Sequence, residues 1–192
     1  MQRSTISTIW RSARLTASAL CLIAALIILI RAGLPERAQA NAVVPPLPGQ
    51  LPIAAEEGAL APPFEVHDLA NKPISLTALR GSPVILNFWA TYCGPCIVEM
   101  PLLQSVYAAH RAEGLHVIGV DANEPLADVM AWRNRFDLSY DLVFDGGMLS
   151  SLYRVRGLPS TFFIGRDGVI TKITFGAVSA EELQAEVANL LH

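Results

Sequence analysis

The stretch VILNFWATYCGPCIVEMP, residues 84–101, carries most of the information about the fold. Its first six residues, VILNFW, form an apolar run with one polar residue, which is typical of a strand covered on both faces. From Cys96 onward, apolar residues recur at helical spacing until the glycine at position 114. The stretch therefore predicts a buried strand that delivers Cys93 and Cys96 to the start of a helix.

The rest of the chain alternates between strand and helix patterns. The expected strands are 73–76, 116–120, 141–145, 161–164 and 169–174, and the expected helices are 126–136, 148–153 and 179–191. Ser179 is the predicted N-cap of the last helix, and Glu182 completes a capping box. This order predicts one mixed central sheet with helices on both faces, which is a single α/β domain.

The N-terminal segment predicts export. The uncharged run at 15–30 would span roughly 24 Å as a helix, and its extension to residue 34 makes a plausible transmembrane helix. The arginines of residues 1–14 favour a cytoplasmic N-terminus. A cleaved signal peptide is the main alternative, because Ala38-Gln39-Ala40 fits a cleavage site, and a buried core helix is a third interpretation. Either an anchor or a signal peptide would export the remainder.

A proline-rich linker is expected at 35–58 and a globular domain at 59–192. Residues 1–40 carry a net charge of +4 from five arginines and one glutamate, so the rest of the chain carries −7 of the total of −3. Because this acidic part offers no electrostatic footprint for nucleic acid, nucleic-acid binding is excluded.

The spacing of the two cysteines allows three interpretations. With His110 and His116 they satisfy a zinc-finger pattern, but fourteen residues of helix would place Cys96 about 21 Å from His110, whereas zinc bonds are about 2 Å long. As a structural staple, so short a loop would contribute only about 2 kcal/mol. A redox centre accounts best for the neighbouring residues.

In the redox interpretation, Cys93 occupies the first position of the helix, where free N–H groups and the helix dipole stabilise a thiolate. Cys96 follows one turn later, on the same side and within disulfide reach. Gly94 keeps the approach to Cys93 open, and Pro95 fits the first turn because it needs no N–H donor there. Cys93 is therefore expected to attack a partner disulfide and Cys96 to resolve the mixed disulfide.

WATYCGPC resembles the active-site segment of thioredoxins, and residues 59–192 resemble the TlpA/ResA-type membrane-anchored thioredoxin-like proteins. The matching segments are APPFEV, LNFWATYCGPCIVEMP and GLPSTFFIGRDGVI. The resemblance implies a thioredoxin fold and a thiol-disulfide oxidoreductase without cofactor or metal. It would reduce disulfides of extracytoplasmic proteins, for example in cytochrome c or oxidase maturation, and be re-reduced by a membrane electron donor. Its expected place is the bacterial inner membrane with the domain in the periplasm, or the periplasm itself if the chain is cleaved after Ala40.

The resemblance also assigns roles to individual residues. Pro159 corresponds to the family's cis-proline, which packs beside the cysteines and helps to bind the partner's backbone; an ordinary trans proline is the alternative. Trp89, Tyr92, Gly94 and Pro95 are expected to form the wall of the active site, although Trp89 would serve equally well in the core.

Asn87 stands where thioredoxins carry a buried aspartate, and an amide cannot take up a proton at neutral pH. Glu99, three residues after Cys96, is the replacement that the family's CxxCxxE pattern implies. We expect a half-buried carboxyl that accepts the proton of Cys96. The alternative is an acid in the first helical turn, placed there by the helix dipole.

Other features bear on the choice of function. The Gly-Pro dipeptide and Ser160, which is not acidic, depart from members dedicated to cytochrome c maturation. Leu86 and Ala90 occupy the Pro and Thr positions of the PxxxTxxC motif of thiol peroxidases, which disfavours that activity. A copper-handling or assembly chaperone that uses the dithiol as a soft ligand remains the non-enzymatic alternative.

Overall fold

The structure is a computed structural model, and it describes residues 50–144 and 146–192. The predicted anchor or signal segment at 15–34 and most of the predicted linker lie outside these residues. Within the described part, no helix has both the length and the apolar character needed to cross a bilayer.

The core of the domain is a five-stranded sheet with the order β5-β4-β3-β6-β7. Its strands are β3 (Val84–Trp89), β4 (His116–Asp121), β5 (Asp141–Val143), β6 (Ser160–Ile164) and β7 (Ile170–Phe175). β3, β4 and β5 are parallel to one another. β6 runs antiparallel to β3, and β7 runs antiparallel to β6. The predicted mixed sheet is therefore confirmed, and each predicted strand lies within two residues of its expected bounds.

Four α-helices complete the domain: α2 (Gly94–His110), α3 (Leu126–Arg135), α4 (Met148–Leu152) and α5 (Ala180–Leu191). A short 3-10 helix, η1 (Arg111–Glu113), follows α2. Ser179 caps α5 as predicted, because its hydroxyl accepts the N–H of Glu182. The Glu182 carboxylate instead accepts a hydrogen bond from the hydroxyl of Thr174 on β7, 2.8 Å away. The other half of the predicted capping box is thus replaced by a contact to the sheet.

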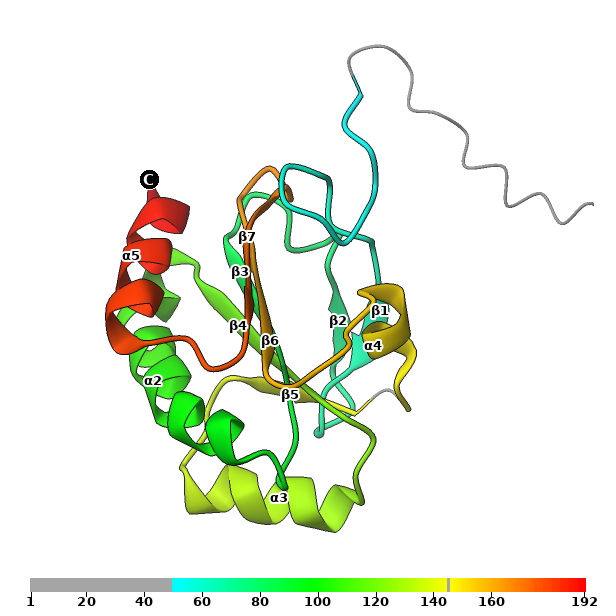
Figure 1. Cartoon of the computed structure of the whole chain (residues 1–192), viewed down its shortest axis with the longest axis vertical. Coiled ribbons are helices and arrows are strands. Elements are labelled where there is room, and N and C mark those ends of the chain that lie inside the picture. Colours follow the sequence, from blue (N-terminus) through cyan, green and yellow to red (C-terminus); the bar gives the residue numbers. More distant parts are fainter. Residues whose placement is uncertain (1–49, 145) are drawn as a thin grey trace, which may run out of the picture. The chain divides into compact units, whose positions relative to one another are not determined.

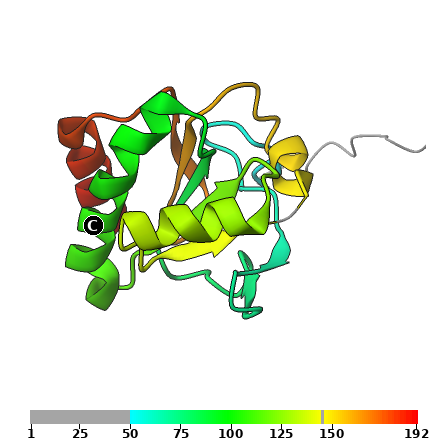
Figure 2. The same cartoon turned by 90° about the horizontal axis from the view of Figure 1, so that it is seen from below.

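The two faces of the sheet are covered by different elements. Figure 1 shows α2 and α5 on one side, with α3 below them, and α4 on the other side together with β1 (Glu65–His67) and β2 (Pro73–Ser75). Figure 2, turned by 90°, shows α3 crossing one end of the sheet. β1 and β2 pair antiparallel as a separate small sheet, and β1 has no counterpart among the predicted elements.

The residues just before the predicted domain start at Ala59 form hydrogen bonds to the sheet. The N–H of Gly58 donates to the carbonyl of Ile170 on β7 at 2.8 Å. The Glu57 carboxylate accepts the N–H of Ile173 on the same strand, also at 2.8 Å. Because β7 is an edge strand, these bonds satisfy backbone groups that would otherwise remain open. The last two residues of the predicted linker therefore contact the edge strand of the sheet.

Candidate active site

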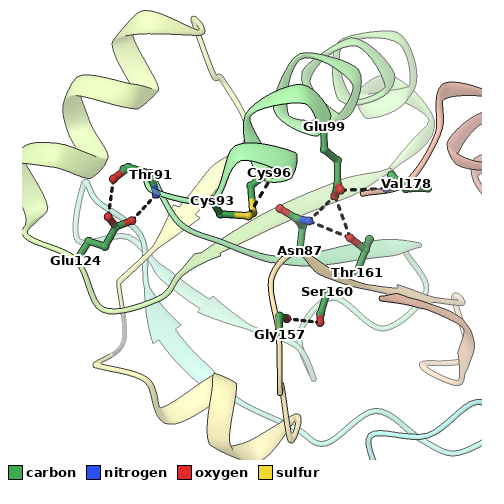
Figure 3. The surroundings of a disulfide bond; sticks show 10 residues. All are labelled: Asn87, Thr91, Cys93, Cys96, Glu99, Glu124, Gly157, Ser160, Thr161 and Val178. Atoms are coloured by element: carbon green, nitrogen blue, oxygen red, sulfur yellow. Dashed lines mark hydrogen bonds between the residues drawn. A yellow bond between two sulfur atoms is a disulfide. The ribbon is translucent and has the colours of Figure 1, made fainter. Parts of the chain in front are cut away.

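The cysteine pair lies where β3 ends and α2 begins (Figure 3). A tight turn connects β3 to α2, and it is closed by the N–H of Cys93, which donates to the carbonyl of Ala90 at 3.2 Å. Cys93 is the N-cap of α2, one position before the predicted start, and its sulfur accepts the N–H of Cys96 at 3.3 Å. The two residues form a disulfide with their Cα atoms 5.3 Å apart. The strand and the helix thus hold the two cysteines close enough to form a disulfide.

The two sulfur-bearing residues differ in their access to solvent. Cys93 is 8% exposed, whereas Cys96 is 1% exposed. Gly94 and Pro95 are both exposed, and a Cβ added at Gly94 would meet nothing within 4 Å. An incoming disulfide can therefore approach Cys93 across these residues, while Cys96 is almost completely shielded from solvent.

The two aromatic residues expected at the wall lie in different environments. The side chain of Tyr92 is 73% exposed beside the pair. Trp89 is completely buried and belongs to the apolar cluster that contains both cysteines. Trp89 thus supports the pair from within the core, which was one of its two expected positions, and Tyr92 is free to contact a partner.

Glu99 occupies the centre of a buried hydrogen-bond cluster beside the cysteines (Figure 3). Its Oε1 accepts the Asn87 amide at 2.6 Å and the Thr161 hydroxyl at 3.0 Å. Its Oε2 accepts the N–H of Val178 at 3.1 Å. The Asn87 amide also donates to the Thr161 hydroxyl at 2.9 Å. β3, β6 and the loop before α5 therefore each supply a donor to one carboxyl group on α2.

The environment of Glu99 gives its carboxyl unusual proton affinity. Burial raises its pKa from 4.5 to about 7, although the three hydrogen bonds act in the opposite direction. The side chain is fully buried rather than half-buried as expected. Glu99 also lies in the second turn of α2, which has no acidic residue in its first turn, so placement by the helix dipole is wrong. A carboxyl with this pKa can exchange a proton at neutral pH.

Pro159 lies directly before β6, at the same end of the sheet as the cysteines. The Leu158–Pro159 peptide bond is cis, as predicted. The next residue, Ser160, pairs with Phe88 of β3, and its hydroxyl donates to the carbonyl of Gly157. A hollow of about 660 Å³ opens beside Pro159 and is lined by aromatic, aliphatic and arginine side chains. The loop before β6 is therefore placed to contact a molecule bound near this edge.

The histidines of the zinc-finger pattern do not join the cysteines. His110, the last residue of α2, contacts Glu113 at 2.8 Å. His116 begins β4, at the opposite end of the sheet from Cys93. Across the described ranges, no three side chains of His, Cys, Asp or Glu are grouped so that they could hold a metal ion.

Some residues at the site were not predicted from the sequence. Thr161 and Val178 were not singled out: Thr161 lies in the matching segment GLPSTFFIGRDGVI but was given no role, and Val178 lies in none of the matching segments. A second acidic group, Asp121 and Glu124, lies at the carboxyl end of β4 and contacts Thr91, two residues before Cys93. The sequence did carry a signal for this group, because Asp121 follows the expected strand at 116–120 directly and Glu124 comes three residues later.

Comparison with known proteins agrees with this geometry. The model of the AhpC/TSA family matches residues 58–173. The thiol-disulfide oxidoreductase ResA of Halalkalibacterium halodurans is 37% identical over 138 residues, which are 71% of this chain and 78% of that protein.

Solved structures support the same fold. A thiol:disulfide interchange protein of the thioredoxin family from Chlorobium tepidum aligns with a TM-score of 0.65 and 26% identity, over 69% of this chain and 96% of that one. A secreted disulfide oxidoreductase of Mycobacterium tuberculosis, homologous to E. coli DsbE, aligns with a TM-score of 0.61 and 26% identity, over 66% and 96%. The predicted thioredoxin-like fold is thus confirmed. The chain belongs to the AhpC/TSA family and, within it, to the thiol-disulfide oxidoreductases of the ResA type.

Proposed function

We propose that the protein is an exported, membrane-tethered reductase of disulfides in extracytoplasmic proteins. The observation that carries this proposal is the unequal cysteine pair at the start of α2, with a buried carboxyl of pKa about 7 one turn further along the helix. Support for export comes from the apolar segment at 15–34 and from the M. tuberculosis relative, which is described as secreted.

The reaction begins with the reduced pair. The thiolate of Cys93, the more exposed residue, attacks one sulfur of the partner's disulfide. A bond forms between that sulfur and Cys93, the partner's disulfide breaks, and its second sulfur leaves as a thiolate that takes up a proton. The free N–H groups at the start of α2 stabilise the attacking thiolate.

The second step releases the partner. Cys96 gives its proton to the Glu99 carboxylate, and the resulting thiolate attacks the sulfur of Cys93. The mixed disulfide breaks, the partner's remaining sulfur leaves as a thiolate, and the pair ends as the disulfide seen in the structure. Two electrons have passed from the pair to the partner. A membrane-bound dithiol donor would return them.

The charges around the pair favour reduction over oxidation as the net direction. No positively charged residue stands between the cysteines, since the dipeptide is Gly-Pro. The acidic groups at the site, Glu99 and the Asp121–Glu124 pair, disfavour a further negative charge on Cys93. A thiolate that is only moderately stabilised leaves the disulfide comparatively hard to reduce, as in a reducing dithiol.

The substrates would include proteins whose cysteines must be reduced before haem or copper is inserted, as in cytochrome c or oxidase maturation. The departures at Gly94-Pro95 and Ser160 favour a set of substrates wider than apocytochrome c alone.

Trapping in cells tests the proposal. The full-length Cys96→Ser variant should accumulate mixed disulfides with extracytoplasmic proteins in the membrane fraction, because the resolving thiol is missing. A Cys93→Ser variant expressed at the same level is the control and should trap none. Trapped partners confined to the cytoplasm, or equal trapping by both variants, would contradict the proposal.

A further inference from the structure

The turn that carries Cys93 is held by the side chain of Glu124, which lies in the loop between β4 and α3. Thr91 lies inside the turn closed between Ala90 and Cys93. The two oxygens of the Glu124 carboxylate accept the N–H and the hydroxyl of Thr91, at 2.5 Å each (Figure 3). A bidentate, charge-assisted pair of bonds fixes both the position and the orientation of the donor.

Glu124 is itself held in place by Asp121, the last residue of β4. The Asp121 Oδ1 accepts the N–H of Glu124 at 2.7 Å. Asp121 is completely buried, and its Oδ2 has no hydrogen-bond partner within the protein. β4 pairs with β3 through Trp89 and Asp121, and the N–H of Ala122 donates to the carbonyl of Trp89 at 3.0 Å. A continuous set of contacts therefore runs from β4 through Asp121 and Glu124 to the turn of Cys93.

Neither carboxyl group takes part in the two exchange steps of the proposed reaction, although their negative charge bears on its direction. We propose that Glu124 is a positioning residue for disulfide exchange: oriented by Asp121, its carboxylate holds Thr91 and so sets the position of Cys93 for attack. This inference rests on the function proposed above and identifies a further residue on which its rate depends. Misplacing a reacting group by about 1 Å can slow a reaction about a hundredfold.

The carboxyl groups of Asp121 and Glu124 interact with each other. Burial and the adjacent Glu124 raise the pKa of Asp121 from 3.8 to about 7. The neighbours Trp89, at the end of β3, and Thr91, in the turn after it, carry no charge. Arg156 lines a hollow of about 280 Å³ together with Ala122, the residue after Asp121. Removing the charge of Glu124 therefore removes negative charge from beside the Cys93 turn.

A double-mutant cycle in the reduced full-length protein tests the inference. The probe is oxidised glutathione, and the readout is the second-order rate constant for its reaction between pH 5 and 9. Glu124→Gln should slow the reaction about tenfold at pH 7. Thr91→Val, which keeps the shape but loses the hydroxyl donor, should slow it several-fold, and Thr91→Ser should restore most of that loss. In the Glu124→Gln background, Thr91→Val should change the rate less than twofold, because the acceptor is already altered.

The pH profile separates positioning from a general loss of structure. Glu124→Gln should move the midpoint of the profile to lower pH, since a negative charge near the reacting sulfur is gone. The control is Asp128→Asn, which removes an exposed acid from the first turn of α3 and should leave rate and midpoint unchanged. Circular dichroism establishes that each variant is folded. If Thr91→Val slows both backgrounds equally, or if Glu124→Gln behaves like Asp128→Asn, the inference is wrong. An inactive wild-type protein would instead overturn the proposed function.

Discussion

The two faces of the central sheet differ although the same strands build both. On the α2 side, Asn87 of β3 and Thr161 of β6 point into a polar cluster around Glu99. Their neighbours in sequence, Phe88 and Phe162, point to the other side and pack against each other with ring centroids 5.7 Å apart. Consecutive residues of the same strand therefore face either the polar cluster or the aromatic core.

The difference has an energetic meaning. Buried polar groups cost free energy unless they are hydrogen-bonded. The buried carboxyl of Glu99 is hydrogen-bonded by donors from β3, β6 and the loop before α5. On the opposite side, Tyr153 packs edge-on against Phe64 and Phe162, and its hydroxyl donates to the carbonyl of Pro62. We therefore expect changes on the α2 side to affect the reaction and changes on the other side to affect stability.

The largest effect is expected at Cys93. Cys93→Ser should abolish disulfide exchange, because it removes the attacking sulfur, whereas Cys96→Ser should still form mixed disulfides that are not resolved. Alkylation of the reduced protein, followed by mass spectrometry, should label Cys93 first. Preferential labelling of Cys96, the more buried residue, would reverse the two roles.

The next effect concerns Glu99. Glu99→Gln should slow the resolving step about 10- to 100-fold near pH 7 and flatten its pH dependence, because the amide cannot accept the proton of Cys96. Single-turnover release of a trapped partner measures this step. Glu181→Gln, at an exposed acid in the first turn of α5, is the matched control. A pH profile unchanged in Glu99→Gln would assign the cluster to structure alone.

The same carboxyl makes stability depend on pH. A pKa raised from 4.5 in the unfolded chain to about 7 in the fold stabilises the fold fully below pH 4.5, and this contribution is lost as the pH rises through 7. The shift corresponds to about 3 kcal/mol. Urea unfolding of the oxidised protein at pH 5 and pH 8 should therefore show a lower free energy of unfolding at pH 8.

Glu99→Gln should reduce this pH dependence without removing it, because burial also raises the pKa of Asp121 to about 7. A wild-type free energy of unfolding that is equal at the two pH values would contradict the assigned state of Glu99.

On the opposite face, Phe162→Leu should lower the free energy of unfolding by about 2 kcal/mol, since it removes ring contacts to Phe88 and Tyr153. The rate of exchange at 20 °C should stay within twofold of the wild-type rate. A tenfold loss of rate in this folded variant would show that the two faces are not functionally separate.

The last comparison concerns two glycines. A Cβ at Gly119 would lie 2.7 Å from the Leu142 Cδ2 and 3.1 Å from the Trp89 Nε1, so Gly119→Ala should destabilise the fold by about 1 to 3 kcal/mol. Gly94 has open space at the same position, and Gly94→Ala should change stability by less than about 0.5 kcal/mol. Thermal unfolding of the two variants measures the difference; equal melting temperatures would contradict the packing described around Trp89.

The order of strands and helices could be predicted because the signals are local. The run VILNFW marks β3, and the helical periodicity after Cys96 marks α2. β1, in which only Val66 is buried, was not predicted. The contacts of Glu57 and Gly58 with β7 could not be foreseen, because they join distant parts of the sequence; Glu57 and Ile173 are 116 residues apart.

The candidate site could be predicted only in part. Cys93, Cys96 and the cis bond before Pro159 follow from motifs near them in sequence. The full burial of Glu99 did not follow, because its donors Thr161 and Val178 are brought to it only by the folded sheet. The same holds for Thr91 and Glu124, which are 33 residues apart.

The central claim is that the pair acts as a reductase, and its reduction potential tests that claim most directly. The wild-type protein would be equilibrated with glutathione redox buffers at pH 7, and the fraction of the Cys93–Cys96 disulfide quantified after alkylation. The acidic surroundings and the absence of a cation between the cysteines predict a potential nearer the thioredoxin value of about −270 mV than the −120 mV of a strong oxidant. A potential above about −180 mV would make the protein an oxidant or isomerase and contradict the account.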